Sequence, residues 1–307
     1  MNWLAFVAIA VLFDSTRIFI DNYTSDVYFK GHSAVSQKLF YGYASIICCI
    51  IILLITRFDI LHLDIANFGF MFLSGAIGGL AGIPYYKALE IDDSTNIGIF
   101  TQLAPVFYLI LGWLFLGESI SGIQLIAFLI ILSAPLLILL TSRKRSRKIK
   151  LRAIILALIY VVIAVISNLI FIKNDSEQVG FPNEIAFMLL GKGIANLIII
   201  YTHPKWKKRF RTVFNHHKKA ILKPLIANSI IGVIKDLAYR SALIAAPAVA
   251  LASAASDSAE PIVIFFMGIV LTLIWPKFGR EKLNKKSVLI HLAATILIVA
   301  GVILLQF

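Results

Sequence analysis

Long apolar runs separated by short polar segments dominate this chain. A helix needs about 20 such residues to cross the hydrocarbon core of a bilayer. Backbone groups in lipid must hydrogen-bond within their own segment, so continuous runs indicate helices, whereas a β-barrel would show weaker alternation. The runs predict an all-α membrane protein with ten transmembrane helices, at residues 2–21, 35–56, 65–89, 96–116, 122–141, 153–172, 183–202, 224–245, 249–274 and 288–306.

The composition agrees with that pattern. Hydrophobic residues make up 60% of the 307 residues and charged residues only 15%, which is too apolar for a soluble domain of this length. The first run contains Asp14 and Arg17 and has no Lys or Arg before it. Those features favour a retained first helix over a cleaved signal peptide. The lipid bilayer is therefore an expected partner.

The positions of the basic residues predict an orientation. The connections after odd-numbered predicted helices hold 21 Lys and Arg, whereas the other connections and the two termini hold only Arg57 and Lys173. Because cytoplasmic loops are enriched in Lys and Arg, we expect a multi-pass protein of the cell (cytoplasmic) membrane with both termini extracytoplasmic. The net charge of +13 lies in loops and does not indicate a nucleic-acid partner. The basic connection at about residues 203–223 is interpreted as an inner-face anchor, in the form of an amphipathic helix on anionic headgroups.

A basic segment at residues 143–152 divides the chain into two halves of five predicted helices, 1–142 and 153–307. The halves echo each other: Tyr85, Ala88 and Leu89 correspond to Tyr239, Ala242 and Leu243, and Pro105 corresponds to Pro261. An odd number of helices per half forces the second half to enter the membrane inverted. The pattern predicts two inverted five-helix repeats around a central cavity, joined by a cytoplasmic hinge. The alternative is chance similarity among apolar helices.

The fourth predicted helix resembles a known family. Residues 101–121 (TQLAPVFYLILGWLFLGESIS) carry a proline within the helix and a Gly-Glu pair at its end, here Pro105, Gly117 and Glu118. This stretch resembles the hallmark of EamA-type proteins of the drug/metabolite transporter superfamily. The second half departs from the hallmark, since a longer helix follows Pro261. The resemblance implies a cavity walled mainly by predicted helices 1, 3, 4, 6, 8 and 9, with helices 5 and 10 more peripheral. Family members export or exchange amino acids, drugs and other metabolites.

Charged residues within the spans are the strongest candidates for a role in transport. A charge at mid-bilayer costs about 3 kcal/mol on insertion scales, so such residues usually face a bundle interior or a watery cavity. Uncharged polar residues in the spans could hydrogen-bond a substrate or join helices. The candidates for substrate binding or coupling are Asp257, Glu260, Lys235, Asp236, Arg240, Lys192, Asp14, Arg17, Tyr85, Tyr239, Gln102, Tyr108 and Asn168.

Two carboxylates of the ninth predicted helix suggest coupling to protons. Asp257 and Glu260 are three residues apart and share one face, and Ser253 precedes Asp257 by four residues. Neighbouring carboxylates in a low dielectric bind protons more tightly. The alternative is a static pair neutralised by basic residues of the eighth helix.

Several other intramembrane charges also allow a structural interpretation. In the eighth helix, Asp236 and Arg240 have ion-pair spacing. Asp14 and Arg17 could neutralise each other in the first helix. Two further lysines, Lys38 and Lys87, are expected to extend to the cytoplasmic surface.

The sequence therefore predicts a secondary transporter, an exporter or exchanger that moves a small, amino-acid-like metabolite by alternating access with protons as the coupling ion. An uncoupled facilitator or a flippase for a lipid-linked or amphipathic substrate is the alternative. The chain shows no HExxH or GxSxG motif, so we expect no enzyme activity. No metal or other cofactor is expected, and adjacent Cys48 and Cys49 are interpreted as packing residues. The sequence pattern gives no indication of the oligomeric state.

Overall fold

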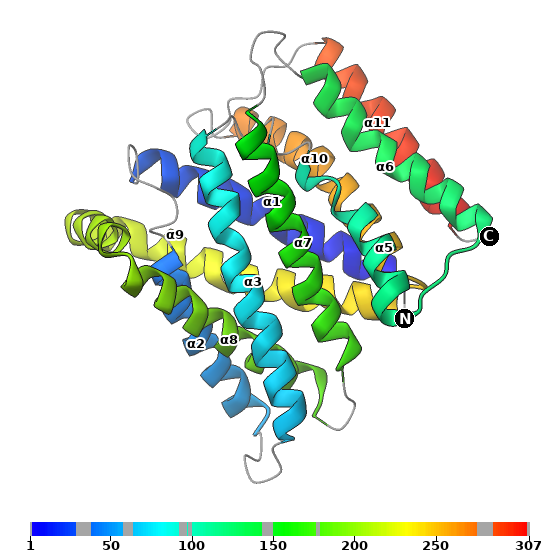
Figure 1. Ribbon diagram of the computed structural model, residues 1–307. Coiled ribbons are helices and arrows are strands. Elements are labelled where there is room, and N and C mark those ends of the chain that lie inside the picture. The colour runs from blue at the N-terminus through cyan, green and yellow to red at the C-terminus, as the bar shows by residue number, and fades with distance from the viewer. Residues whose placement is uncertain are drawn as a thin grey trace.

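The computed structural model describes residues 2–28, 38–57, 64–91, 97, 100–142, 150–175, 179–274 and 285–305. Within these ranges the regular elements are helices. They are α1 (Trp3–Val27), α2 (Lys38–Ile55), α3 (Ile65–Ile91), α5 (Ala104–Leu116), α6 (Gly122–Ser142), α7 (Leu151–Lys173), α8 (Phe181–Thr202), α9 (Pro204–Ala245), α10 (Val249–Ile274) and α11 (Lys285–Leu304) (Figure 1).

The outer surface of this helix bundle is apolar. Leu54 is 72% exposed, Ile296 68% and Trp113 66%, and such an apolar surface suits lipid better than water. By length and composition, α1, α2, α3, α7, α8 and α10 can each cross a membrane, while α5, α6 and α11 contain shorter apolar stretches. The chain is a multi-pass membrane protein, and the count of ten spans stays a prediction.

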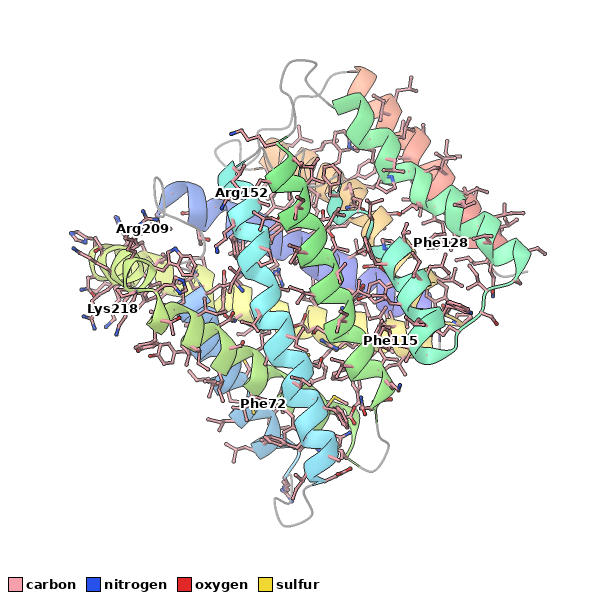
Figure 2. All side chains as sticks on the ribbon, in the orientation of Figure 1. Phe72, Phe115, Phe128, Arg152, Arg209 and Lys218 are labelled. Carbon is pink, nitrogen blue, oxygen red and sulfur yellow. The ribbon has the colours of Figure 1, made fainter. Side chains whose placement is uncertain are left out.

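Helix α9 begins 20 residues earlier than expected, since residues 204–223 are helical and were predicted as a connection. The backbone bends at His217, where φ is −123° and ψ is 17°. Before the bend, Phe210 and Val213 are buried in a cluster with Leu39 and Ile200. The amphipathic helix is present, but its apolar side packs on the protein and not on lipid. Arg209, which neighbours Phe210 in the sequence, is exposed (Figure 2).

The two halves of the chain interleave. Helix α3 packs against α7 and α8, α1 packs against α9 and α10, and α2 packs against α8. Helices α6 and α11 lie side by side at one edge of the bundle (Figure 1), as the family resemblance implied for the fifth and tenth helices. Most contacts of the inner helices are therefore between halves, so the interior forms only when both halves are present.

Small residues bring α3 and α8 into backbone contact. A methyl group at Gly75 would overlap the carbonyl oxygen of Met188, and one at Gly191 would overlap that of Phe72. Helix α3 is also tied to α7, because Ser74 Oγ donates to the Ser167 carbonyl at 2.7 Å and Ser167 Oγ donates to the Ser74 carbonyl at 2.8 Å. Close approach through small residues is the usual basis of helix packing in lipid.

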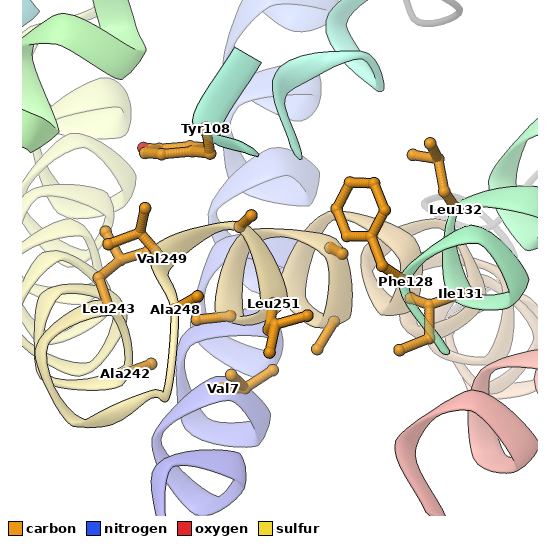
Figure 3. Packing of buried hydrophobic residues seen from close by; sticks show 14 of the residues in the cluster. Val7, Tyr108, Phe128, Ile131, Leu132, Ala242, Leu243, Ala248, Val249 and Leu251 are labelled. Carbon is orange, nitrogen blue, oxygen red and sulfur yellow. The ribbon is translucent and has the colours of Figure 1, made fainter. Parts of the chain in front are cut away.

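An apolar cluster fills one end of the bundle interior. It includes Val7 from α1, Tyr108 from α5, Leu243 from α9, and Val249 and Leu251 from α10 (Figure 3). In α1, α9 and α10 these residues lie close to one helix end, and charged residues lie nearer the middle of the same helices. We call this group the apolar cluster.

Candidate functional site

A cavity of about 460 Å³ lies between the helices, a volume in the usual range for small-molecule sites. Its described lining comes from α1, α2, α3, α5, α7, α8, α9 and α10, and from residues 101 and 102, with no contribution from α6 or α11. The expected set of walls was incomplete, because it lacked α2 and α8; α8 packs closely on α2 and α3, and both α2 and α8 contribute lining residues. All the candidates predicted from sequence line this cavity: Asp14, Arg17, Tyr85, Gln102, Tyr108, Asn168, Lys192, Lys235, Asp236, Tyr239, Arg240, Asp257 and Glu260.

Charged side chains of α8, α9 and α1 form a chain of alternating sign. Lys192 Nζ lies 2.9 Å from Asp236 Oδ2, and the other oxygen of Asp236 lies 3.7 Å from Lys235 Nζ. Lys235 Nζ is also 3.4 Å from Asp14 Oδ2. Lys192, which has no partner on its own helix, is thus neutralised by α9.

The chain of charges continues along α1. Arg17 Nε lies 3.5 Å from Asp14 and 3.9 Å from Asp21, so the expected pairing of Asp14 with Arg17 is present. Asp21 also accepts hydrogen bonds from the Tyr41 hydroxyl and from Asn228 Nδ2. We call the six charged residues of this chain the ion-pair ladder: Lys192, Asp236, Lys235, Asp14, Arg17 and Asp21. With equal numbers of cations and anions, the ladder has no net formal charge.

Arg240 lies outside the ladder. Its guanidinium carbon sits 4.2 Å from the centre of the Phe171 ring, and Nη1 is buried with no hydrogen-bond partner. The spacing of Asp236 and Arg240 predicted an ion pair between them, but the structure shows none. Asp236 instead points both of its oxygens at lysines.

The two carboxylates of α10 also lie outside the ladder. Asp257 Oδ2 accepts a hydrogen bond of 2.8 Å from Ser253 Oγ. Among the described residues, no cation comes within 4.0 Å of Asp257 or Glu260, because Lys235 is held by Asp14 and Asp236. Direct contact with basic residues of α9, which the static-pair interpretation requires, is therefore missing in the part of the chain that the structure describes.

Uncharged polar groups surround these carboxylates. Asn168 Nδ2 donates to the Tyr108 hydroxyl, and Tyr239 lies next to both Tyr108 and Ser253. These groups separate the cavity from the apolar cluster, of which Tyr108 is also a member. Gln102 Oε1 is buried with no hydrogen-bond partner, so it is available to a ligand. Tyr85 stacks at an angle on another ring of the lining, Tyr160 of α7.

Sequence reasoning missed two charged residues of the cavity. Lys38 was expected to extend to the membrane surface, but it is only 7% exposed and donates to the Gly79 carbonyl at 2.8 Å and to Asn196 Oδ1 at 3.2 Å. Asp21 was placed at the end of a span, whereas α1 continues to Val27. Both residues were judged by their distance from an expected helix end, and the sequence does not show where that end lies relative to the cavity. Lys87, in contrast, is exposed as expected.

The Gly-Glu pair after α5 joins the two halves. Gly117 has φ of 70°, a left-handed conformation that suits glycine at a helix C-terminus. The turn directs Glu118 to the start of α10, where Glu118 Oε2 accepts a 3.0 Å hydrogen bond from the Val249 backbone N–H. Burial raises the pKa of the Glu118 carboxyl above its ordinary value, and the Val249 N–H opposes that shift.

Comparison with solved structures supports the fold. Of 28 solved chains that match, one is a crystal structure of a protein that shares 15% sequence identity with this chain. The superposition has a TM-score of 0.59 and covers 99% of this chain and 96% of the other. At that identity the likeness extends to the fold alone. No curated protein matches the sequence.

The sequence model of the EamA-like transporter family matches residues 24–140. The matched segment contains the helix hallmark with Pro105, Gly117 and Glu118. It confirms the family resemblance, and members of this family are transporters and not enzymes. Over residues 24–140 the chain is therefore similar to the EamA-like transporter family, as the hallmark of its fourth predicted helix indicated.

Proposed function

We propose that this protein is a secondary transporter that moves a small zwitterionic metabolite, amino-acid-like in its charge, by alternating access. The observation that carries the proposal is the charge balance of the cavity. Its described lining holds five cations and five anions, namely Arg17, Lys38, Lys192, Lys235 and Arg240 against Asp14, Asp21, Asp236, Asp257 and Glu260. A balanced cavity favours a solute that carries both signs over one with a large net charge.

The helix contacts support two inverted repeats, divided as 1–142 and 153–307 with the basic hinge 143–152 between them. In such a repeat each helix of the first half has a counterpart in the second: α1 corresponds to α7, α2 to α8, α3 to α9, α5 to α10 and α6 to α11. Replacing each helix by its counterpart should then turn one observed helix contact into another. The α1–α9 contact becomes α7–α3, and α1–α10 becomes α7–α5; both members of each pair are present. Helices α2 and α8, α5 and α10, and α6 and α11 pair with their own counterparts. An inverted repeat of ten spans would produce such a two-fold pattern among these contacts.

The predicted orientation indicates which end of the cavity is closed in this structure and on which side of the membrane that end lies. With basic loops in the cytoplasm of a cell-membrane protein, most of the lining residues of α1 and α2 fall toward the cytoplasmic ends of their helices. The apolar cluster then closes the extracytoplasmic end, and both termini lie outside. Alternating access would open this cluster and close the cytoplasmic side around the same site.

Asp257 and Glu260 are our candidates for proton coupling. Neither has an ion-pair partner among the described residues, and the negative charges of Asp14 and Asp257 act on Glu260 against the opposing positive charges of Lys235 and Arg17. A proton taken up by this pair would relieve repulsion without breaking the ladder. Export or exchange against protons follows from such a step.

Transport by the purified protein in liposomes tests this proposal. We expect uptake of a member of an L-amino-acid panel to respond to a pH gradient. Asp257→Asn and Glu260→Gln should lose gradient-driven accumulation and keep exchange of labelled for unlabelled solute. Uptake independent of the gradient in the unmodified protein would favour an uncoupled facilitator. A preference for bulky apolar cations would contradict the zwitterion proposal.

A further inference from the structure

We propose that the Arg240 guanidinium binds a single carboxylate group of the transported solute, at the closed end of the cavity. The inference rests on the proposed transport function and adds the subsite that would select the solute's anionic group. It is carried by the burial of Arg240, by the missing partner of its Nη1 atom, and by the engagement of the other cavity cations.

Arg240 is built into the wall as a fixed donor. It is 6% exposed, and its guanidinium lies over Phe171, which is itself fully buried. Stacking on an aromatic ring holds the guanidinium plane while leaving its N–H edge free to bind. Nη1 is one of the buried nitrogens without a hydrogen-bond partner, and the residue lines the cavity. A buried donor that lacks a partner is costly, and a bound anion would remove that cost.

The other cations of the cavity are already engaged. Lys192, Lys235 and Arg17 each have a carboxylate within 4.0 Å. Lys38 has no carboxylate but donates two hydrogen bonds, to Gly79 and to the Asn196 side chain. Arg240 is therefore the cation in the described lining that a solute could bind without displacing an internal partner.

The charge count indicates which anion fits. One unengaged guanidinium balances one negative charge, and its planar donors match the two oxygens of a carboxylate. A phosphate group with two negative charges would leave one charge unbalanced at this depth. The same cavity also holds Asp257 and Glu260, which have no ion-pair partner among the described residues, and their negative charge favours a solute that carries an ammonium group.

The depth of Arg240 gives the solute a direction. Arg240 is followed in α9 by Ala242 and Leu243 of the apolar cluster, and it lies next to Tyr108 and Tyr239. Its carboxylate subsite is therefore at the closed end, beside the groups that must separate when that end opens. A solute bound there would contact both the wall and the closure.

A ligand-stabilisation screen on the purified full chain tests the assignment, since a ligand that binds only the folded protein raises its melting temperature. The probes are the common L-amino acids, each beside its decarboxylated amine, with inorganic phosphate as a further anion. We expect at least one amino acid to stabilise the protein while its amine does not. Arg240→Gln should weaken binding of that amino acid roughly tenfold or more and remove the discrimination. Lys87→Gln, an exposed position outside the cavity, should bind as the unmodified protein does.

Arg240→Lys guards against a folding defect, because it keeps the positive charge and loses the planar fork. We expect this variant to bind the amino acid with intermediate affinity and to elute as a single species from a sizing column. Stabilisation by amines and amino acids alike, unchanged in Arg240→Gln, would overturn the assignment, as would stabilisation by phosphate alone or by none of the amino acids. Liposome transport that persists with lost carboxylate discrimination in Arg240→Gln supports the subsite. Discrimination without any transport by the unmodified protein would instead count against the proposed function.

Discussion

A methyl group added to Gly75 should separate α3 from α8. The new carbon would overlap the carbonyl oxygen of Met188 and also crowd the backbone nitrogen of Lys192 at 2.9 Å. Backbone atoms cannot rotate away as a flexible side chain can, so the helices must move apart. Overpacking of this kind costs about 1–3 kcal/mol and occasionally more.

The same helix offers a matched control. Gly69 also lies in α3, and a methyl group there would meet no other atom within 4 Å. Alanine is favoured over glycine in a helix by about 1 kcal/mol, so Gly69→Ala should stabilise the protein slightly. Gly75→Ala receives the same helix-propensity gain but also the overlap. We therefore expect Gly75→Ala to be less stable than Gly69→Ala by about 1–3 kcal/mol.

Unfolding of both purified variants in detergent, followed by tryptophan fluorescence or by loss of the monodisperse elution peak, measures this difference. The partner position provides a second test, because Gly191 faces Phe72 across the same contact. Once one methyl group has separated the helices, a second should cost less, so the Gly75→Ala and Gly191→Ala effects should not add. Equal stability of the Gly69 and Gly75 variants would refute the close contact of α3 with α8, and with it the placement of Lys192.

Two further predictions concern contacts that cross between helices. Lys192→Gln should destabilise the protein by about 1–3 kcal/mol, because the Asp236 carboxylate loses one of its two lysine partners. Adding Asp236→Asn should recover part of the loss, which thermal unfolding of the single and double variants measures; equal losses in both would contradict the pairing. Glu118→Ala should loosen the start of α10 and expose the apolar cluster, so that a cysteine introduced by Val249→Cys reacts faster with a water-soluble maleimide. Glu118→Gln keeps an acceptor oxygen, so in that variant the same cysteine should react nearly as slowly as in the Val249→Cys protein alone. An unchanged reaction rate in Glu118→Ala would contradict the bridging role.

The existence of the helices and the candidate residues could be predicted because both signals are local. An apolar run of the right length identifies a helix from its own residues, and a charge within such a run is forced toward the interior by its cost in lipid. All the predicted candidates accordingly line one cavity. The first part of α9 was predicted only as an amphipathic helix on the membrane surface, because its basic residues lower the apolar content, whereas its apolar face with Phe210 and Val213 packs on the protein.

The pairing of the charges could not be predicted, because it depends on how the helices pack. Spacing along α9 favoured a bond from Asp236 to Arg240, yet Lys192 arrives from α8 and Lys235 turns toward the same carboxylate. No sequence signal distinguishes a carboxylate that receives two lysines from one that receives none, such as Glu260. The distinction matters because it separates charges that stabilise the fold from charges that remain available to a solute.

The ion-pair ladder also indicates where the two halves are joined. Arg17, Asp14 and Asp21 belong to α1 in the first half, whereas Lys192, Lys235 and Asp236 belong to α8 and α9 in the second. Within the ladder the 3.4 Å contact between Lys235 and Asp14 connects these groups. A rigid-body movement of one half against the other must therefore stretch this contact or pivot about it, and breaking it would leave one uncompensated negative charge on α1 and one uncompensated positive charge on α8 and α9. Among the described residues, the unpaired charges on α9 and α10 lie outside this contact, so a solute can neutralise them without disturbing the ion pair between the halves.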